Sequence, residues 1–151
     1  MTRSVQHGSF TVERRFNAAP AQVFRAFADE RAKERWFAGP DQWSLMERDM
    51  EFRPGGQERL KGKWANGTVT IFDAYYFDIV EDERIVYAYE MHANGKKISV
   101  SLATITLAPV GEGTLLTVRE DGTFIDGHDD AGSREQGTRH LLEKLAQSLG
   151  E

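Results

Sequence analysis

The sequence lacks cysteine, a long hydrophobic run and an excess of positive charge. Without cysteine there is no disulfide, no thiolate metal site and no cysteine nucleophile. No apolar segment reaches the roughly 20 residues of a membrane helix, and the first residues lack the apolar centre of a signal peptide. The formal net charge of -5 argues against nonspecific nucleic-acid binding. We therefore expect a cytoplasmic protein with neither nucleic-acid nor membrane partners.

The composition is that of a folded globular protein. Of the 151 residues, 40% are hydrophobic and 28% are charged, and no internal repeat, linker or low-complexity tract interrupts them. A chain of this length can bury a core of its own. We expect a single domain over residues 1–151.

Two Asn-Gly pairs, in the stretches WANGTV and HANGKK, stand between strand-like segments. Asn-Gly accommodates the two positive φ angles of a type I′ turn, so each pair predicts a β-hairpin. The first would join strands at 58–64 and 68–80, and the second would join strands at 84–91 and 97–107. The stretches SFTVERRF, QWSLMERDMEF and TLLTVRED predict further strands, which makes about seven, mostly antiparallel.

Two short helices are predicted after the first strand. Pro20 suits a first helical turn, and Phe24 and Phe27 share one face of the helix that follows. Asp29 is placed to cap a second helix that runs to about Phe37.

The end of the chain predicts a long amphipathic helix over about residues 131–149. Ser133 and Gln136 form an S-x-x-Q capping-box pattern at its start. Gly137 would let this helix approach a sheet closely, or else is tolerated in a frayed first turn. The sector that should face the sheet holds both apolar and polar side chains: Arg134, Thr138, Leu141, Leu142, Leu145 and Leu149.

These elements predict an α+β fold. An antiparallel sheet with one apolar face must be covered, and the last helix is the available cover. We expect a curved sheet of six or seven strands wrapped around that helix.

Four stretches in order resemble the AHSA-type family: VERRFNAAPAQVFRAFADERAKERWF, FRPGG, YFDIVEDERIVYAYE and REQGTRHLLEKLAQSL. Its members are homologues of the C-terminal domain of the activator of the heat-shock protein 90 ATPase, within the START-like, or SRPBCC, superfamily. The resemblance implies a helix-grip fold with a cavity between sheet and helix, and no single activity. Where the family commonly has Gly-Trp in the last helix, this chain has Gly137-Thr138, so we expect a roomier or more polar cavity.

No catalytic or metal-binding pattern is recognisable among the polar residues. His7 lies in a terminus expected to be mobile, His92 near a surface turn, and His140 off the apolar sector, facing solvent. The run His128-Asp129-Asp130 is interpreted as a loop that also caps the last helix, because adjacent residues rarely converge on one ion.

The carboxylates and the glycine-rich turn likewise match no catalytic or phosphate-binding motif. Glu90, Glu120 and Asp121 are interpreted as exposed strand carboxylates. The RPGG stretch at 53–56 is typical of a tight turn rather than a phosphate site, and no nucleophile elbow, P-loop or dinucleotide fingerprint is present. We predict no catalytic residue, no metal and no cofactor.

Aromatic residues indicate a binding cavity instead. Tyr87, Tyr89 and Met91 share one strand face, and buried tyrosines need hydroxyl partners. Small-molecule cavities are mostly apolar with a few placed polar groups. The candidate cavity residues are Trp36, Trp64, Phe72, Tyr87, Tyr89, Met91, Arg134, Thr138, Leu141 and Leu145.

Three functions remain open on the sequence. The first is a carrier or sensor of a small apolar molecule, the second an enzyme of the cyclase or hydrolase type found in the superfamily, and the third a chaperone-cofactor-like binding module. Arg134 could pair with a strand carboxylate such as Glu90 or Glu120, reach solvent, or bind a ligand anion, in which case the ligand would carry a carboxylate or phenolate. A weak homodimer is also expected from short edge strands.

Overall fold

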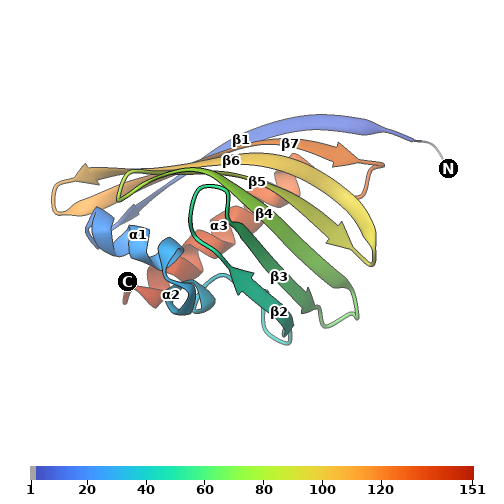
Figure 1. The fold of residues 1–151 in the computed structure, drawn as a ribbon, viewed down its shortest axis with the longest axis horizontal. Coiled ribbons are helices and arrows are strands. Elements are labelled where there is room, and N and C mark those ends of the chain that lie inside the picture. The colour runs from blue at the N-terminus through green and yellow to red at the C-terminus, as the bar shows by residue number, and fades with distance from the viewer. Residues whose placement is uncertain (1–2) are drawn as a thin grey trace.

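The computed structural model describes residues 3–151 and contains seven strands and three helices in that range (Figure 1). The strands are β1 (Val5–Phe16), β2 (Ser44–Met50), β3 (Gln57–Lys63), β4 (Val69–Val80), β5 (Arg84–Ala93), β6 (Lys96–Val110) and β7 (Gly113–Ile125). The helices are α1 (Pro20–Ala28), α2 (Glu30–Glu34) and α3 (Ala131–Ser148).

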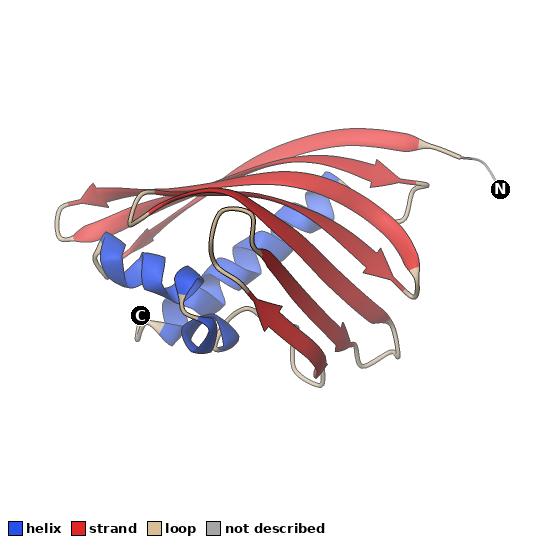
Figure 2. Ribbon diagram, viewed as in Figure 1, coloured by secondary structure: helices blue, strands red, loops and turns tan. Residues whose placement is uncertain are grey.

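The strands form one antiparallel sheet in the order β1-β7-β6-β5-β4-β3-β2. Every neighbouring pair except β1 and β7 is also consecutive in the chain, as short links require. Figure 2 shows the sheet curving, with all three helices on the same side of it. The predicted α+β fold, with a curved sheet around the last helix, is confirmed.

The main core lies between α3, α1 and the β1 side of the sheet. From α3, Leu142, Leu145 and Ala146 are buried, and α1 contributes Phe24 and Phe27 from the face predicted for it. These side chains meet the inward-facing residues of β1, β6 and β7: Phe10, Val12, Phe16, Ile105, Leu107, Leu116 and Val118. Alternation along each strand explains this set, because every second side chain points to the same face.

Both Asn-Gly pairs lie in hairpin turns, but only one has the predicted turn type. Asn94 and Gly95 both have positive φ angles, 50° and 80°, as a two-residue type I′ turn requires. In the other turn only Gly67 has positive φ, and the Asn66 side chain accepts a hydrogen bond from the backbone of Thr68. Five residues separate β3 from β4, so this longer loop does not need the type I′ geometry.

The helix boundaries correct two predictions. Asp29 caps α2 as expected, but the helix ends at Glu34 rather than near Phe37. The N-cap of α3 is Asp130, whose carboxylate accepts hydrogen bonds from the backbone nitrogen (2.8 Å) and hydroxyl (3.0 Å) of Ser133. The capping-box prediction for Ser133 was therefore wrong, because the N-cap lies three residues earlier at Asp130, while the predicted start of the helix near residue 131 and its capping by the loop at 128–130 are confirmed.

Gly137 does not mark a close contact between helix and sheet. A Cβ atom built at this residue would meet nothing within 4 Å, and the residue lies in the second turn of α3 rather than at a frayed end. Both sequence-based interpretations were therefore wrong. The helix stands away from the sheet here because a cavity lies between them.

None of the helices described between residues 3 and 151 is both long enough and apolar enough to cross a membrane.

Candidate functional site

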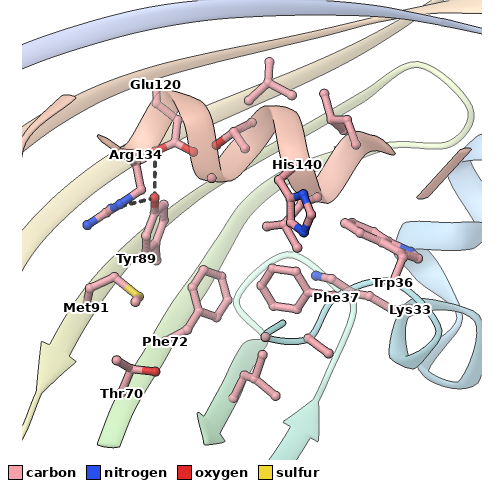
Figure 3. Close-up of a pocket in the computed structure, with 18 of the residues that line it drawn as sticks. Lys33, Trp36, Phe37, Thr70, Phe72, Tyr89, Met91, Glu120, Arg134 and His140 are labelled. Carbon is pink, nitrogen blue, oxygen red and sulfur yellow. Dashed lines mark hydrogen bonds between the residues drawn. The ribbon is translucent and has the colours of Figure 1, made fainter. Parts of the chain in front are cut away.

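A cavity of about 370 Å³ lies between the inner face of the sheet, α3 and the loop that follows α2 (Figure 3). This volume is within the range of small-molecule sites, about 300–1,000 Å³. Side chains from β4, β5 and β7 form its floor, α3 forms one wall, and residues 36–43 close the side opposite.

Nine of the ten candidate residues line this cavity: Trp36, Trp64, Phe72, Tyr87, Tyr89, Met91, Arg134, Thr138 and Leu141. The tenth, Leu145, lies one turn further along α3 and is fully buried in the main core. That these residues bind a ligand stays a prediction.

The floor of the cavity is aromatic. Tyr87, Tyr89 and Met91 are alternate residues of β5 and face the same way, and Phe72 on β4 lies opposite Met91 in the strand register. The Phe72 ring centroid is 4.8 Å from that of Tyr89 and 5.0 Å from that of Phe37. These contacts hold the rings in place and present a fixed apolar surface.

Arg134 is anchored inside the protein by three partners. It donates hydrogen bonds to the Tyr89 hydroxyl (2.9 Å), to Ser99 Oγ (2.9 Å) and to Asp129 Oδ2 (2.7 Å). Of the three alternatives left open for Arg134, the structure contains an internal ion pair, but the partner is Asp129 of the loop before α3 rather than a strand carboxylate such as Glu90 or Glu120. Asp129 lies in the loop between β7 and α3, immediately before the N-cap Asp130 and five residues before Arg134.

Glu120 is buried at the same end of the cavity, contrary to the expectation of an exposed carboxylate. Its exposed fraction is 5%, and its Oε1 accepts a hydrogen bond from the Tyr89 hydroxyl at 2.7 Å. Burial raises the pKa of the Glu120 carboxyl above its ordinary value, while the hydrogen bond from Tyr89 and the charge of Arg134 act in the opposite direction. Figure 3 shows the resulting chain, Arg134 to Tyr89 to Glu120.

The inward orientation of Glu120 could have been read from the alternation of β7. Leu116, Val118 and Glu120 are every second residue, and the first two are core. The other two strand carboxylates of the prediction face away from the cavity. Asp121 pairs with Arg119 and Glu90 pairs with Lys97, so no carboxylate pair forms.

A second buried polar cluster, which the sequence reasoning missed, lies beside the cavity. Lys33 Nζ donates to Glu58 Oε1 at 2.6 Å, and the Tyr76 hydroxyl donates to the same oxygen. The exposed fractions of Lys33 and Glu58 are 7% and 3%. Burial, followed by the negative charge of Glu58, raises the pKa of Tyr76. The only sequence signal for the burial of Glu58 was its position two residues before Leu60 on β3, which puts both side chains on the same face, and this signal is weak.

The loop at the mouth of the cavity is tied to α3. Lys144 Nζ donates to the backbone oxygens of Ala38 (3.2 Å) and Gly39 (3.1 Å). Trp64, 38% exposed, lies on the rim. His140 was expected to face solvent only; it is exposed, but it also lines the cavity and lies on that side of α3 in Figure 3.

The remaining histidine and glycine motifs have structural roles. His7 belongs to β1 and is paired with Thr123 of β7, so the mobile terminus expected there was wrong. Asp129 and Asp130, which follow His128, hold Arg134 and cap α3. The RPGG stretch forms the predicted tight turn, with Gly55 at φ 84°.

Comparison with known proteins matches most of the chain to one protein family. The family model described as "Activator of Hsp90 ATPase homolog 1-like protein" matches residues 17–150. No curated protein matches the chain.

Three solved structures are similar over nearly the whole chain. A protein from Rhizobium leguminosarum is 39% identical with a TM-score of 0.94, and the match covers 99% of each chain. The Mll3558 protein from Rhizobium loti is 43% identical with a TM-score of 0.88, covering 96% of this chain and 99% of that one. Protein CV1439 from Chromobacterium violaceum is 28% identical with a TM-score of 0.77, covering 92% and 94%.

Proposed function

The chain belongs to the family of Activator of Hsp90 ATPase homolog 1-like proteins, and from this premise we propose that it binds a small apolar molecule between its sheet and α3, as a carrier or sensor. The observation that carries the proposal is the cavity of about 370 Å³, with an aromatic floor and few polar groups. A domain that acted only through its outer surface would have no need of such a space.

The residue pair Gly137-Thr138 supports the proposal from the side of the helix. Both residues line the cavity, and the space in front of Gly137 is empty for at least 4 Å. The tryptophan that the sequence resemblance leads one to expect after the glycine would occupy part of this volume. A short side chain here leaves room for a ligand body against Tyr87 and Tyr89.

The main argument for an anionic group on the ligand was an available Arg134, and the contacts of Arg134 weaken that argument. Arg134 was the residue that would bind such a group, and the guanidinium already has an ion-pair partner in Asp129 and two hydroxyl partners. An anion would have to displace Asp129 or approach a site that also contains Glu120.

Two measurements test the proposal. Native mass spectrometry of protein purified from its host should find a small molecule retained on the chain. Titration with a neutral, fluorescent naphthylamine dye should show saturable binding, which Thr138→Trp weakens about tenfold or more by filling the cavity.

The matched control is Gln136→Trp, which places the same side chain on the exposed face of α3. This variant should bind the dye as the wild type does. If both tryptophan variants bind it equally well, the dye does not occupy the cavity and the proposal is refuted.

An enzyme of the cyclase or hydrolase type is the second candidate, and one observation favours it. Glu120 is a buried carboxyl with a raised pKa, in contact with a phenol at the cavity wall. Groups of this kind serve as general acids or bases in active sites. Under this function Glu120→Gln would abolish turnover of a bound molecule and leave its binding largely intact. The third function, a chaperone-cofactor-like module, has no comparable support. A cavity filled by side chains would have favoured it, whereas this cavity has an open volume of about 370 Å³.

A further inference from the structure

The charges around the cavity do not balance. Lys33 is paired with Glu58, and Arg134 is paired with Asp129. Among residues 3–151, the one remaining buried charge at the cavity is the carboxylate of Glu120, which forms no ion pair. When ionised, it leaves the cavity with an uncompensated negative charge.

Glu120 has an oxygen that the protein does not use. The Tyr89 hydroxyl donates to Oε1, and no donor from the described part of the chain reaches Oε2. Arg134 forms no ion pair with Glu120, because its hydrogen bonds go to Tyr89, Ser99 and Asp129; its charge lowers the pKa of Glu120, but by less than burial raises it. Burial raises the pKa of this carboxyl, as expected for a charge that its surroundings compensate poorly.

The surfaces next to this carboxyl suit a cation. The rings of Tyr89, Tyr87 and Phe72 line the cavity, with centroids 4.8 Å (Phe72 to Tyr89) and 5.9 Å (Tyr87 to Tyr89) apart. Aromatic faces attract ammonium groups, and more strongly where water is excluded. The Tyr87 hydroxyl, which also lines the cavity, forms no side-chain hydrogen bond within residues 3–151, so its oxygen is available to a ligand.

We propose that the cavity selects ligands with a protonated amine on an apolar ring body, the amine donating to Glu120, and rejects the same body when it carries a carboxylate. This inference deepens the binding function proposed above and depends on it. An amine supplies the missing donor and the missing charge together. An alcohol supplies only the donor, and a carboxylate adds a second negative charge beside Glu120.

The experiment compares three ligands that share a naphthalene ring: naphthylmethylamine, naphthylmethanol and naphthoate. Their affinities are measured by calorimetry near neutral pH with the wild type and with two variants. Glu120→Gln removes the charge and retains the shape. Asp121→Asn removes one negative charge from the next residue of β7, whose side chain faces the opposite side of the sheet.

In the wild type we expect the amine to bind about tenfold tighter than the alcohol and the carboxylate about tenfold weaker, the scale of one charge-assisted hydrogen bond. Glu120→Gln should remove the advantage of the amine and leave the affinity for the alcohol within about threefold. Asp121→Asn should leave all three affinities unchanged. Thermal unfolding verifies that each variant is folded, and if Glu120→Gln is not, the ranking in the wild type decides alone.

The outcomes separate this inference from the function on which it depends. If the alcohol binds and the amine binds no better, or if Glu120→Gln weakens both equally, the inference is overturned while the binding function stands. Naphthoate binding as tightly as the alcohol also overturns it. If neither the naphthylamine dye nor any of the three ligands binds, the proposed function is refuted, and so is the inference that depends on it.

Discussion

Replacing Gly137 with alanine should stabilise the protein. Gly137 lies inside an 18-residue helix, and a Cβ atom at this position meets nothing within 4 Å. The substitution therefore adds no clash and removes the conformational freedom that glycine has in the unfolded chain. Alanine is favoured over glycine in a helix interior by about 1 kcal/mol.

The expected gain is measurable in two ways. Urea denaturation should show a free energy of unfolding that is about 1 kcal/mol higher, with an unchanged dependence on urea concentration. For a chain of this size the melting temperature should rise by about 2–4 °C.

Gly127→Ala is the matched control. A Cβ atom at Gly127 also meets nothing within 4 Å, but φ there is 70°, in the left-handed region. The same methyl group should therefore cost about 1–2 kcal/mol of stability. If Gly137→Ala instead lowers stability by about 0.5 kcal/mol or more, the helix touches the sheet at this residue and the empty space described here is wrong.

Three further predictions concern buried side chains. Leu145→Ala should lower the free energy of unfolding by about 2–5 kcal/mol, because Leu145 is fully buried in the core; a loss below about 0.5 kcal/mol in urea denaturation would contradict its burial. Lys33→Met should cost about 3–5 kcal/mol by leaving Glu58 buried without its ion-pair partner, and the double variant with Glu58→Gln should recover most of that loss in a double-mutant cycle. The raised pKa of Glu120 means that the unfolded chain loses this proton at a lower pH than the folded protein does, so the wild type should lose stability relative to Glu120→Gln as the pH rises from about 4 through the folded pKa. Urea denaturation at about pH 4 and about pH 8 tests this, and a constant difference between the two proteins would contradict the burial of an ionising carboxyl.

Much of the cavity wall was predictable because it depends on periodicity within single elements. A strand places every second side chain on one face, so Tyr87, Tyr89 and Met91 had to share an environment. A helix places residues three or four apart on one face, which puts Arg134, Thr138 and Leu141 on the same side of α3. These regularities need no knowledge of the neighbouring element.

The sequence prediction failed where the in-and-out alternation of side chains along a strand was not applied to a charged residue. Glu120 continues the inward row of Leu116 and Val118, yet its charge made an exposed position the default expectation. Lys33 and Glu58 lie 25 residues apart in different elements, and each is buried only because the other neutralises it. No local sequence pattern predicts such a buried ion pair.

What the sequence by itself determined is therefore the kind and order of the elements: the hairpins, the two short helices, the final amphipathic helix and the apolar faces of these elements. These follow from backbone preferences and side-chain periodicity, which act over a few residues. Only the tertiary structure decided that Arg134 meets Asp129, that Tyr89 links Arg134 to Glu120, and that Gly137 faces empty space. Those outcomes depend on the path of one loop and on how far the curved sheet stands from α3, and both are set by the packing of the whole chain.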